Sequence, residues 1–224
     1  MNAHQVEQFL KWATDHSLDV KDWAELSFAP DSHLNRFWEV PPEQKRRADF
    51  LLCMLDLMGK WETCFVWRNM GRWPGVPDYR DINSRVEYQI LTGIGLPMGT
   101  SDIVEFSRSD TDRLVTLIFA STIFGFCVDH DTFLVPNNAQ FILKTSHHNV
   151  VEMAFRTEQA MTQFIAGMQT RGFILPDHLP DATFMQPEWM ENDQQREPAG
   201  GDNVATQRVW PQMLAKFFGK KCGR

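Results

Sequence analysis

The chain has 224 residues, of which 43% are hydrophobic and 23% charged, as is typical of a globular protein that buries a core without disulfides or metal ions. Its formal net charge of −7 disfavours binding to nucleic-acid phosphates and suits a basic protein partner. No apolar run reaches the roughly 20 residues of a membrane-spanning helix, and the N-terminal sequence lacks the pattern of a secretory signal peptide. We therefore expect a cytoplasmic protein without a membrane partner, whose four cysteines are free thiols.

The N-terminal half of the chain is predicted to be mainly helical. Its helices are expected at residues 3–16, 19–26, 31–39 and 42–60. The last of these is the clearest, because Pro42 suits a first helical turn and apolar residues follow with helical spacing. Residues 64–70 either continue as helix or form a strand. A loop rich in glycine and proline follows at 71–81, and then a helix at 82–92.

A small antiparallel sheet is predicted within residues 103–155. Its strands are expected at residues 103–106, 132–136, 140–146 and 150–155. Alternation places Phe141 and Leu143 on one face, and Val151, Met153 and Phe155 on one face of the next strand. Residues 113–128 form a helix or a buried strand. We favour the helix because Ser109 and Asp112 resemble a capping box.

Thr157 is predicted to cap a helix that runs to Arg171 and stops at Gly172. The whole is an α+β fold, with a single domain over residues 1–175. Residues 176–205, rich in Pro, Asp and Gly, are expected to form a loop packed on that domain, and residues 206–224 a helix with a basic tail.

Two clusters of histidine and aspartate flank the predicted strands. Asp129, His130 and Asp131 precede the strand at 132–136, while His147 and His148 lie between the next two strands. Histidine and aspartate are common metal ligands and acid–base groups, so one alternative is a metal-dependent or His/Asp hydrolase. The spacing matches no known metal motif, and adjacent histidines in a strand point to opposite faces. We favour turns, because Asp and Asn suit turns.

The strongest signal for binding is the stretch WETCFVWRNMGRWPGVPDYR at residues 61–80. Tryptophan, tyrosine and arginine are enriched at the energetic centres of protein interfaces. The alternative is that the stretch packs on the core, with arginine stacked on tryptophan. The predicted partner contacts are Trp67, Arg68, Arg72, Trp73, Tyr79, Asp129, Asp131, His147, His148 and Glu152.

The block DTFLVPNNAQFILKTSHHNVVEMAFRTEQAMTQFIAGM indicates a short meander followed by a helix. Together with the acidic charge, the many tryptophans and the lack of a catalytic motif, it resembles the cytosolic immunity proteins of bacterial toxin systems. The resemblance is one of profile over residues 110–175 and rests on no diagnostic motif. It implies a protein without a cofactor that binds and neutralises a cognate toxin. An adaptor or scaffold subunit is a further alternative.

Overall fold

The structure, a computed structural model, describes residues 1–4, 6–20, 26–28, 34–68, 73, 82–96, 99, 103–128, 131–146 and 149–177. These residues all belong to one compact unit, Met1–Met185, and a second unit comprises Gln186–Arg224. The predicted loop beyond Asp177 and the predicted C-terminal helix and tail lie outside the described residues.

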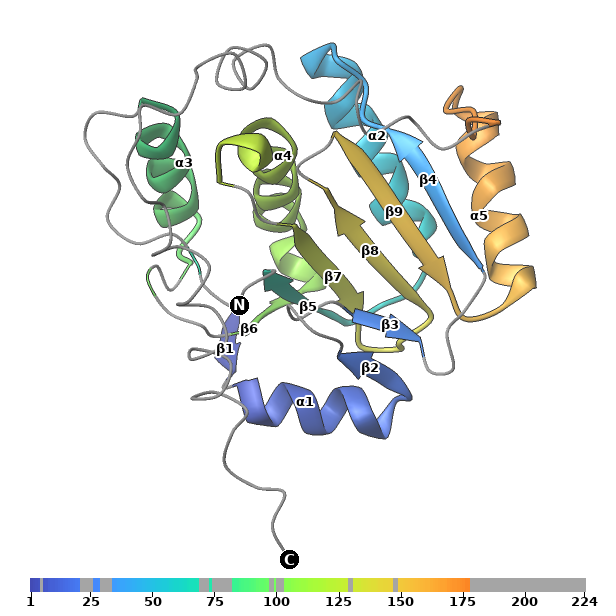
Figure 1. Ribbon diagram of the computed structural model, residues 1–224, viewed down its shortest axis with the longest axis horizontal. Coiled ribbons are helices and arrows are strands. Elements are labelled where there is room, and N and C mark those ends of the chain that lie inside the picture. The colour runs from blue at the N-terminus through green and yellow to red at the C-terminus, as the bar shows by residue number, and fades with distance from the viewer. Residues whose placement is uncertain are drawn as a thin grey trace, which may run out of the picture. The chain divides into compact units, whose positions relative to one another are not determined.

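A seven-stranded antiparallel sheet forms the centre of the first unit, with the strand order β1-β6-β5-β7-β8-β9-β4 (Figure 1). Its strands are β1 (Asn2–His4), β4 (Asn35–Glu39), β5 (Thr63–Arg68), β6 (Ile103–Ser107), β7 (Thr132–Pro136), β8 (Phe141–Thr145) and β9 (Val150–Phe155). A separate antiparallel pair consists of β2 (Leu18–Val20) and β3 (Leu26–Phe28). The helices between the strands are α1 (Val6–Asp15), α2 (Gln44–Leu57), α3 (Ile82–Gly93), α4 (Thr111–Val128) and α5 (Glu158–Thr170).

The prediction of a helical N-terminal half with a small central sheet is wrong. Helices and strands are interleaved along the chain, and strands β1, β4 and β5 of the large sheet lie before residue 70. The segments predicted as helices at 19–26 and 31–39 contain strand residues of β2, β3 and β4. In β4, Trp38 is buried on one face while Phe37, on the other, is only partly buried. The remaining residues of β4 show no regular alternation, and the capping signals at Asp31 and Ser32 favoured a helix in this segment.

Side chains on the two faces of the sheet belong to two separate hydrophobic clusters. The first face carries the larger cluster and is covered by α2, α3, α4 and α5. The second face is covered by α1 and the β2–β3 pair, through residues such as Phe9 and Phe28. Figure 1 shows α1 and the β2–β3 pair lying together, away from α2 and α5. The sheet is therefore the middle layer of three.

The predictions for the second half of the described chain are largely confirmed. Residues 111–128 are helical, and the three strands β7, β8 and β9 form a meander. Leu143 and Met153 pair across the first face, as their alternation predicted. Thr157 caps α5 by accepting a hydrogen bond from the Ala160 amide at 3.2 Å. None of the helices in the described ranges is long and apolar enough to cross a membrane.

The capping box before α4 lies two residues earlier than predicted. Ser107 and Asp110, rather than Ser109 and Asp112, cap the 3-10 helix Arg108–Asp110 that leads into α4. The Ser107 hydroxyl donates to Asp110 Oδ2 at 2.7 Å, and the Met1 ammonium contacts the same oxygen at 2.9 Å. These bonds lower the pKa of the Asp110 carboxyl from 3.8 to about 2, because they stabilise its charged form.

We expect Asp110→Asn to lower the free energy of unfolding near pH 7 by about 1 kcal/mol, as for other helix caps. The folded-state pKa is depressed, so the contribution is present above about pH 3.8 and is lost as the pH falls toward 2. Urea midpoints measured across this range should show the difference between wild type and variant narrowing on acidification. The exposed carboxylate Glu62, which precedes β5, is the control, and Glu62→Gln should change the free energy of unfolding by no more than about 0.5 kcal/mol.

Candidate binding site at one end of the sheet

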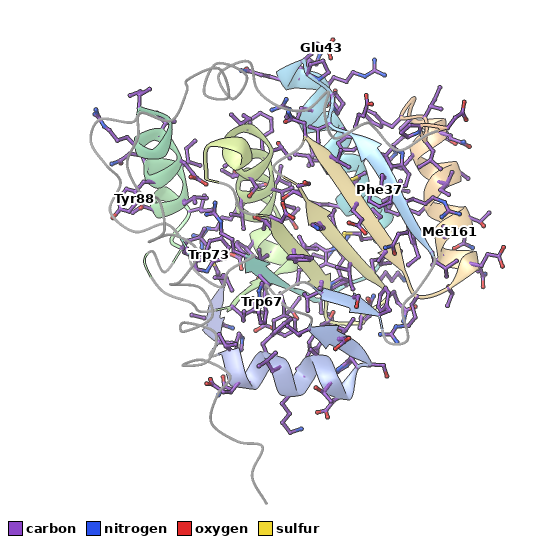
Figure 2. All side chains as sticks on the ribbon, viewed as in Figure 1. Phe37, Glu43, Trp67, Trp73, Tyr88 and Met161 are labelled. Carbon is purple, nitrogen blue, oxygen red and sulfur yellow. The ribbon has the colours of Figure 1, made fainter. Side chains whose placement is uncertain are left out.

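Two rows of paired residues cross the sheet at the end where β5 and β8 finish and β7 and β9 begin. One row, on the second face, runs through Trp67, Phe133, Lys144, Glu152 and Phe37. The other, on the first face, runs through Arg68, Thr132, Thr145, Val151 and Trp38. Several of the residues singled out in the sequence thus fall into two adjacent rows of one sheet. Trp67, Trp73 and Phe37 are labelled in Figure 2.

Arg68 forms a buried ion pair with Glu87 of α3. Its Nη2 lies 3.2 Å from Glu87 Oε1, and the two side chains are only 4% and 3% exposed. Burial lowers the pKa of the Arg68 guanidinium, while the charge of Glu87 and the hydrogen bond to it oppose that shift. The guanidinium also lies 6.0 Å from the centre of the Trp73 ring. The pair therefore attaches α3 to the end of β5.

Burial gives Trp67, Arg68 and Trp73 a structural role. All three are at most 5% exposed, and Trp67 packs against Phe9 of α1 with ring centres 4.8 Å apart. Their burial and the contact of Arg68 with Trp73 agree with the alternative interpretation, arginine stacked on tryptophan within the core, while their contact with a partner stays a prediction. Arg72 and Tyr79, predicted with them, lie outside the described residues.

Lys144, Asp131, Glu152 and Asn35 form a charged network on the second face. Lys144 Nζ lies 3.1 Å from Asp131 Oδ2 and 4.0 Å from Glu152 Oε2. Asn35 Nδ2 donates to Glu152 Oε1 at 2.9 Å, which ties the edge strand β4 to the network. The Lys144 ammonium also lies 5.6 Å from the centre of the Phe133 ring. Glu152 is the most accessible of the three charged side chains, at 23% exposure.

Among the described members of the network, two side chains carry a carboxylate and one carries an ammonium group. Each carboxylate is held by a donor, and the side chains project from paired positions of a sheet, so their geometry is fixed before any ligand arrives. A partly exposed carboxylate in a fixed position can accept a hydrogen bond from an incoming lysine or arginine. The arrangement is suited to recognition of a cation.

Four residues of the two predicted histidine and aspartate clusters lie outside the described residues. They are Asp129, His130, His147 and His148. Their described neighbours lie at the same end of the sheet, since Thr132 pairs with Thr145 and the Ser146 amide donates to the Val150 carbonyl. Asp131 itself is paired with the Lys144 ammonium, which competes with any metal ion for that carboxylate. Within the described ranges, no group of three or more His, Cys, Asp or Glu side chains is placed to hold a metal ion.

Lys144 and Asn35 are members of the network that the sequence interpretation missed. Lys144 and Glu152 each stand at an outward position of an otherwise apolar strand, and an opposite charge on two neighbouring strands favours a cross-strand pair. That signal was available for Lys144. Asn35 gave none, because its segment was taken for a helix.

Fold and site together define an α+β protein with a seven-stranded antiparallel sheet and a charged network at one end of it. No protein-family model, curated protein or solved structure was found to match the chain.

Proposed function

We propose that this protein binds a basic protein partner without catalysing a reaction, and that the partner is a toxin that it neutralises in the cytoplasm. The observation that carries the proposal is the charged network on the second face of the sheet. It presents the partly exposed Glu152 carboxylate in a fixed position beside the half-buried ring of Phe37. A cation flanked by an aromatic side chain is a pairing that protein interfaces use.

The charge of the chain supports the same partner. The net charge of −7 attracts a basic protein over a distance of about one Debye length and speeds its encounter. Close charge pairs formed afterwards determine the orientation of the partner and exclude acidic competitors. The resemblance in profile to immunity proteins points in the same direction.

Affinity capture from the native host, with identification by mass spectrometry, tests the proposal. We expect one basic protein to be recovered with the wild type. Less should be recovered with Glu152→Gln, because the substitution removes the charge but keeps the shape. Glu62→Gln, at an exposed position away from the network, is the matched control and should behave as wild type.

Expression of the captured protein alone, and together with this chain, then tests neutralisation. The proposal predicts that the captured protein impairs growth alone and not when co-expressed. Recovery of a stable assembly of many subunits, with no growth defect from any of them, would instead favour the adaptor alternative.

A further inference from the structure

Strand β4 is the outermost strand on one side of the sheet, and one of its two hydrogen-bonding edges is unpaired among the described residues (Figure 1). Its other edge pairs with β9. The Val40 amide, directly after β4, donates to the Asn149 carbonyl at 2.9 Å and so points toward β9. Because successive backbone groups of an antiparallel strand point in opposite directions, the amides and carbonyls of Asn35, Phe37 and Glu39 point away from β9.

The unpaired edge of β4 is a template for another extended strand. Arg36 Nη1 donates to the Asn35 carbonyl at 2.7 Å, and a carbonyl oxygen can accept a second donor. The amides and carbonyls of Phe37 and Glu39 receive no bond from the residues that the structure describes. Donors and acceptors that alternate along a strand are matched by the backbone of another strand, which is how exposed sheet edges bind proteins. The edge therefore selects an extended segment.

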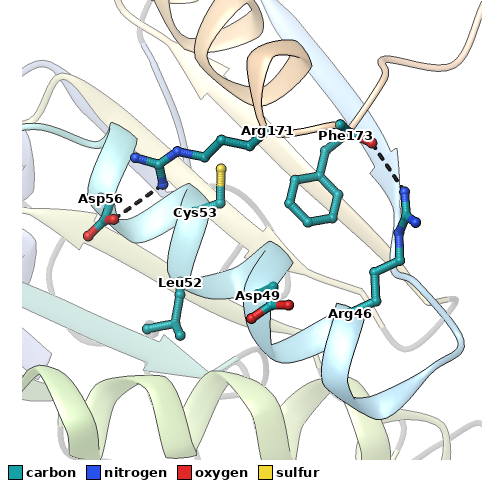
Figure 3. A pocket seen from close by; sticks show the side chains of 8 residues that line it. Arg46, Asp49, Leu52, Cys53, Asp56, Arg171 and Phe173 are labelled. Atoms are coloured by element: carbon teal, nitrogen blue, oxygen red, sulfur yellow. Dashed lines mark hydrogen bonds and ion pairs between the residues drawn. The ribbon is translucent and has the colours of Figure 1, made fainter.

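Helix α5 covers one face of β4 and leaves this edge in the plane of the sheet. Its Phe164 ring packs on Trp38 from the first face, with ring centres 5.7 Å apart. Beyond the helix, Arg171 Nη1 pairs with Asp56 Oδ2 of α2 at 3.2 Å, as Figure 3 shows. These contacts hold α5 against α2 and the face of the sheet. An incoming strand pairs with backbone groups in the plane of the sheet and does not replace the contacts of α5 with the face.

The side chains of β4 are self-complementary about Phe37. Two copies of the strand, antiparallel with the two Phe37 residues on a two-fold axis, place ring against ring on the second face. The same register places Arg36 opposite Trp38 of the second copy, a cation beside an aromatic ring. It also places Asn35 opposite Glu39 of the second copy, an amide donor beside a carboxylate. Each of these cross-strand pairs is favourable, and symmetry repeats the last two.

Neighbouring registers of the same two strands are less favourable. An axis through Arg36 sets two guanidinium groups directly opposite each other, and like charges in that position repel. An axis through Trp38 sets Glu39 opposite Phe37 of the second copy, where a carboxylate meets the negative face of a ring. The axis through Phe37 avoids both conflicts, so a second copy of β4 is itself a strand that complements this edge.

We propose that this chain forms a two-fold symmetric dimer by antiparallel pairing of β4 with β4 of a second copy. The Phe37 amide of each copy donates to the Phe37 carbonyl of the other, and the backbone groups of Asn35 pair with those of Glu39. The two seven-stranded sheets then form one continuous sheet. Each copy carries a net charge of −7, so we expect a weak dimer that strengthens as salt screens the repulsion.

Amide hydrogen exchange, followed by NMR on the full chain in high salt, tests the proposal. We expect the amides of Phe37 and Glu39 to exchange at least about threefold more slowly at roughly 1 mM protein than at roughly 0.02 mM, because the dimer forms by mass action. The amides of Arg36 and Trp38 point toward β9 and should be protected equally at both concentrations. Sedimentation velocity on the same samples should show the mass rising toward that of two chains.

Substitutions at Phe37 test the position of the two-fold axis. Phe37→Lys should abolish the concentration-dependent association, because two ammonium groups then face each other on the axis, and Phe37→Glu should do the same. A one-to-one mixture of these two variants should associate, because their opposite charges face each other. Ala3→Lys, at an exposed position on the other outer strand β1, is the matched control and should associate as the wild type does. Circular dichroism checks that each variant is folded.

Glu152→Gln should leave the dimer intact, so this proposal and the proposed function fail separately. Three results would each overturn the proposal. They are a wild type that stays monomeric at the higher concentration, a dimer in which the Phe37 and Glu39 amides stay unprotected, and equal association of the wild type and Phe37→Lys.

Discussion

Replacing Glu87 with alanine is expected to lower the free energy of unfolding by about 3–5 kcal/mol. The physical reason is that the guanidinium of Arg68, only 4% exposed, loses its ion-pair partner in the interior. Arg68 Nε is already buried without an acceptor among the described residues, so little compensation is at hand. Chemical denaturation at neutral pH, with circular dichroism as the signal, measures the change.

Two further variants show how much of the loss comes from the burial of the Arg68–Glu87 pair and how much from the unpaired charge. The pair Lys11–Asp15, with 78% and 56% exposed side chains, is the surface control, and Lys11→Ala should cost less than about 1 kcal/mol. The double variant Arg68→Met with Glu87→Leu should regain most of the loss, because an apolar pair needs no charge compensation. A loss below about 1 kcal/mol for Glu87→Ala would show that Arg68 is not buried as described.

Replacing Phe164 with alanine is expected to cost about 3–5 kcal/mol of stability, because it opens a cavity between α5 and the sheet. The ring is 2% exposed and contacts Phe155, Trp38 and Phe141, with ring centres 5.3, 5.7 and 6.1 Å away. These three residues come from strands β9, β4 and β8. The variant therefore tests whether α5 covers this side of the sheet, and urea midpoints measure it.

Gln163 is the matched control on the same helix. Its side chain is exposed, so Gln163→Ala should change the free energy of unfolding by no more than about 0.5 kcal/mol. A similar effect of both substitutions would contradict the described orientation of α5.

The parts of the fold that the sequence predicted correctly are those with local signals. The strands β7, β8 and β9 follow one another with short connections, so each lies beside its sequence neighbour. Thr157 and Gly172 delimit α5 by their own chemistry, a side-chain cap at one end and a left-handed residue, φ 81°, at the other. Such features need no knowledge of distant residues.

The size of the sheet was missed because its outer strands pair over long distances. Asn35 of β4 bonds to Glu152 of β9 across 117 positions, and β1 pairs with β6 about as far along the chain. A strand of three or five residues is too short for its alternation to be distinguished from a turn of helix. Only the partner strand determines its conformation, and no local pattern identifies that partner.

The predicted partner contacts stay a prediction, but the structure shows how some of these residues lie. Asp131 and Glu152 were chosen as acidic contacts, and both belong to the charged network. Trp67 and Arg68 were chosen because of their residue types, which are common in interfaces and equally in cores. Burial distinguishes these two cases, and burial depends on which elements cover the strand. The network itself required the register that places Lys144 opposite Glu152.

The ionic-strength dependence of the association rate between this chain and its captured partner tests the central claim most directly. If the charged network attracts and orients a basic protein, the rate should fall at least about tenfold between roughly 0.05 and 0.5 M salt. The fall should be shallower for Glu152→Gln and unchanged for Glu62→Gln. A rate that does not respond to salt, or an equal response of all three proteins, would contradict the account.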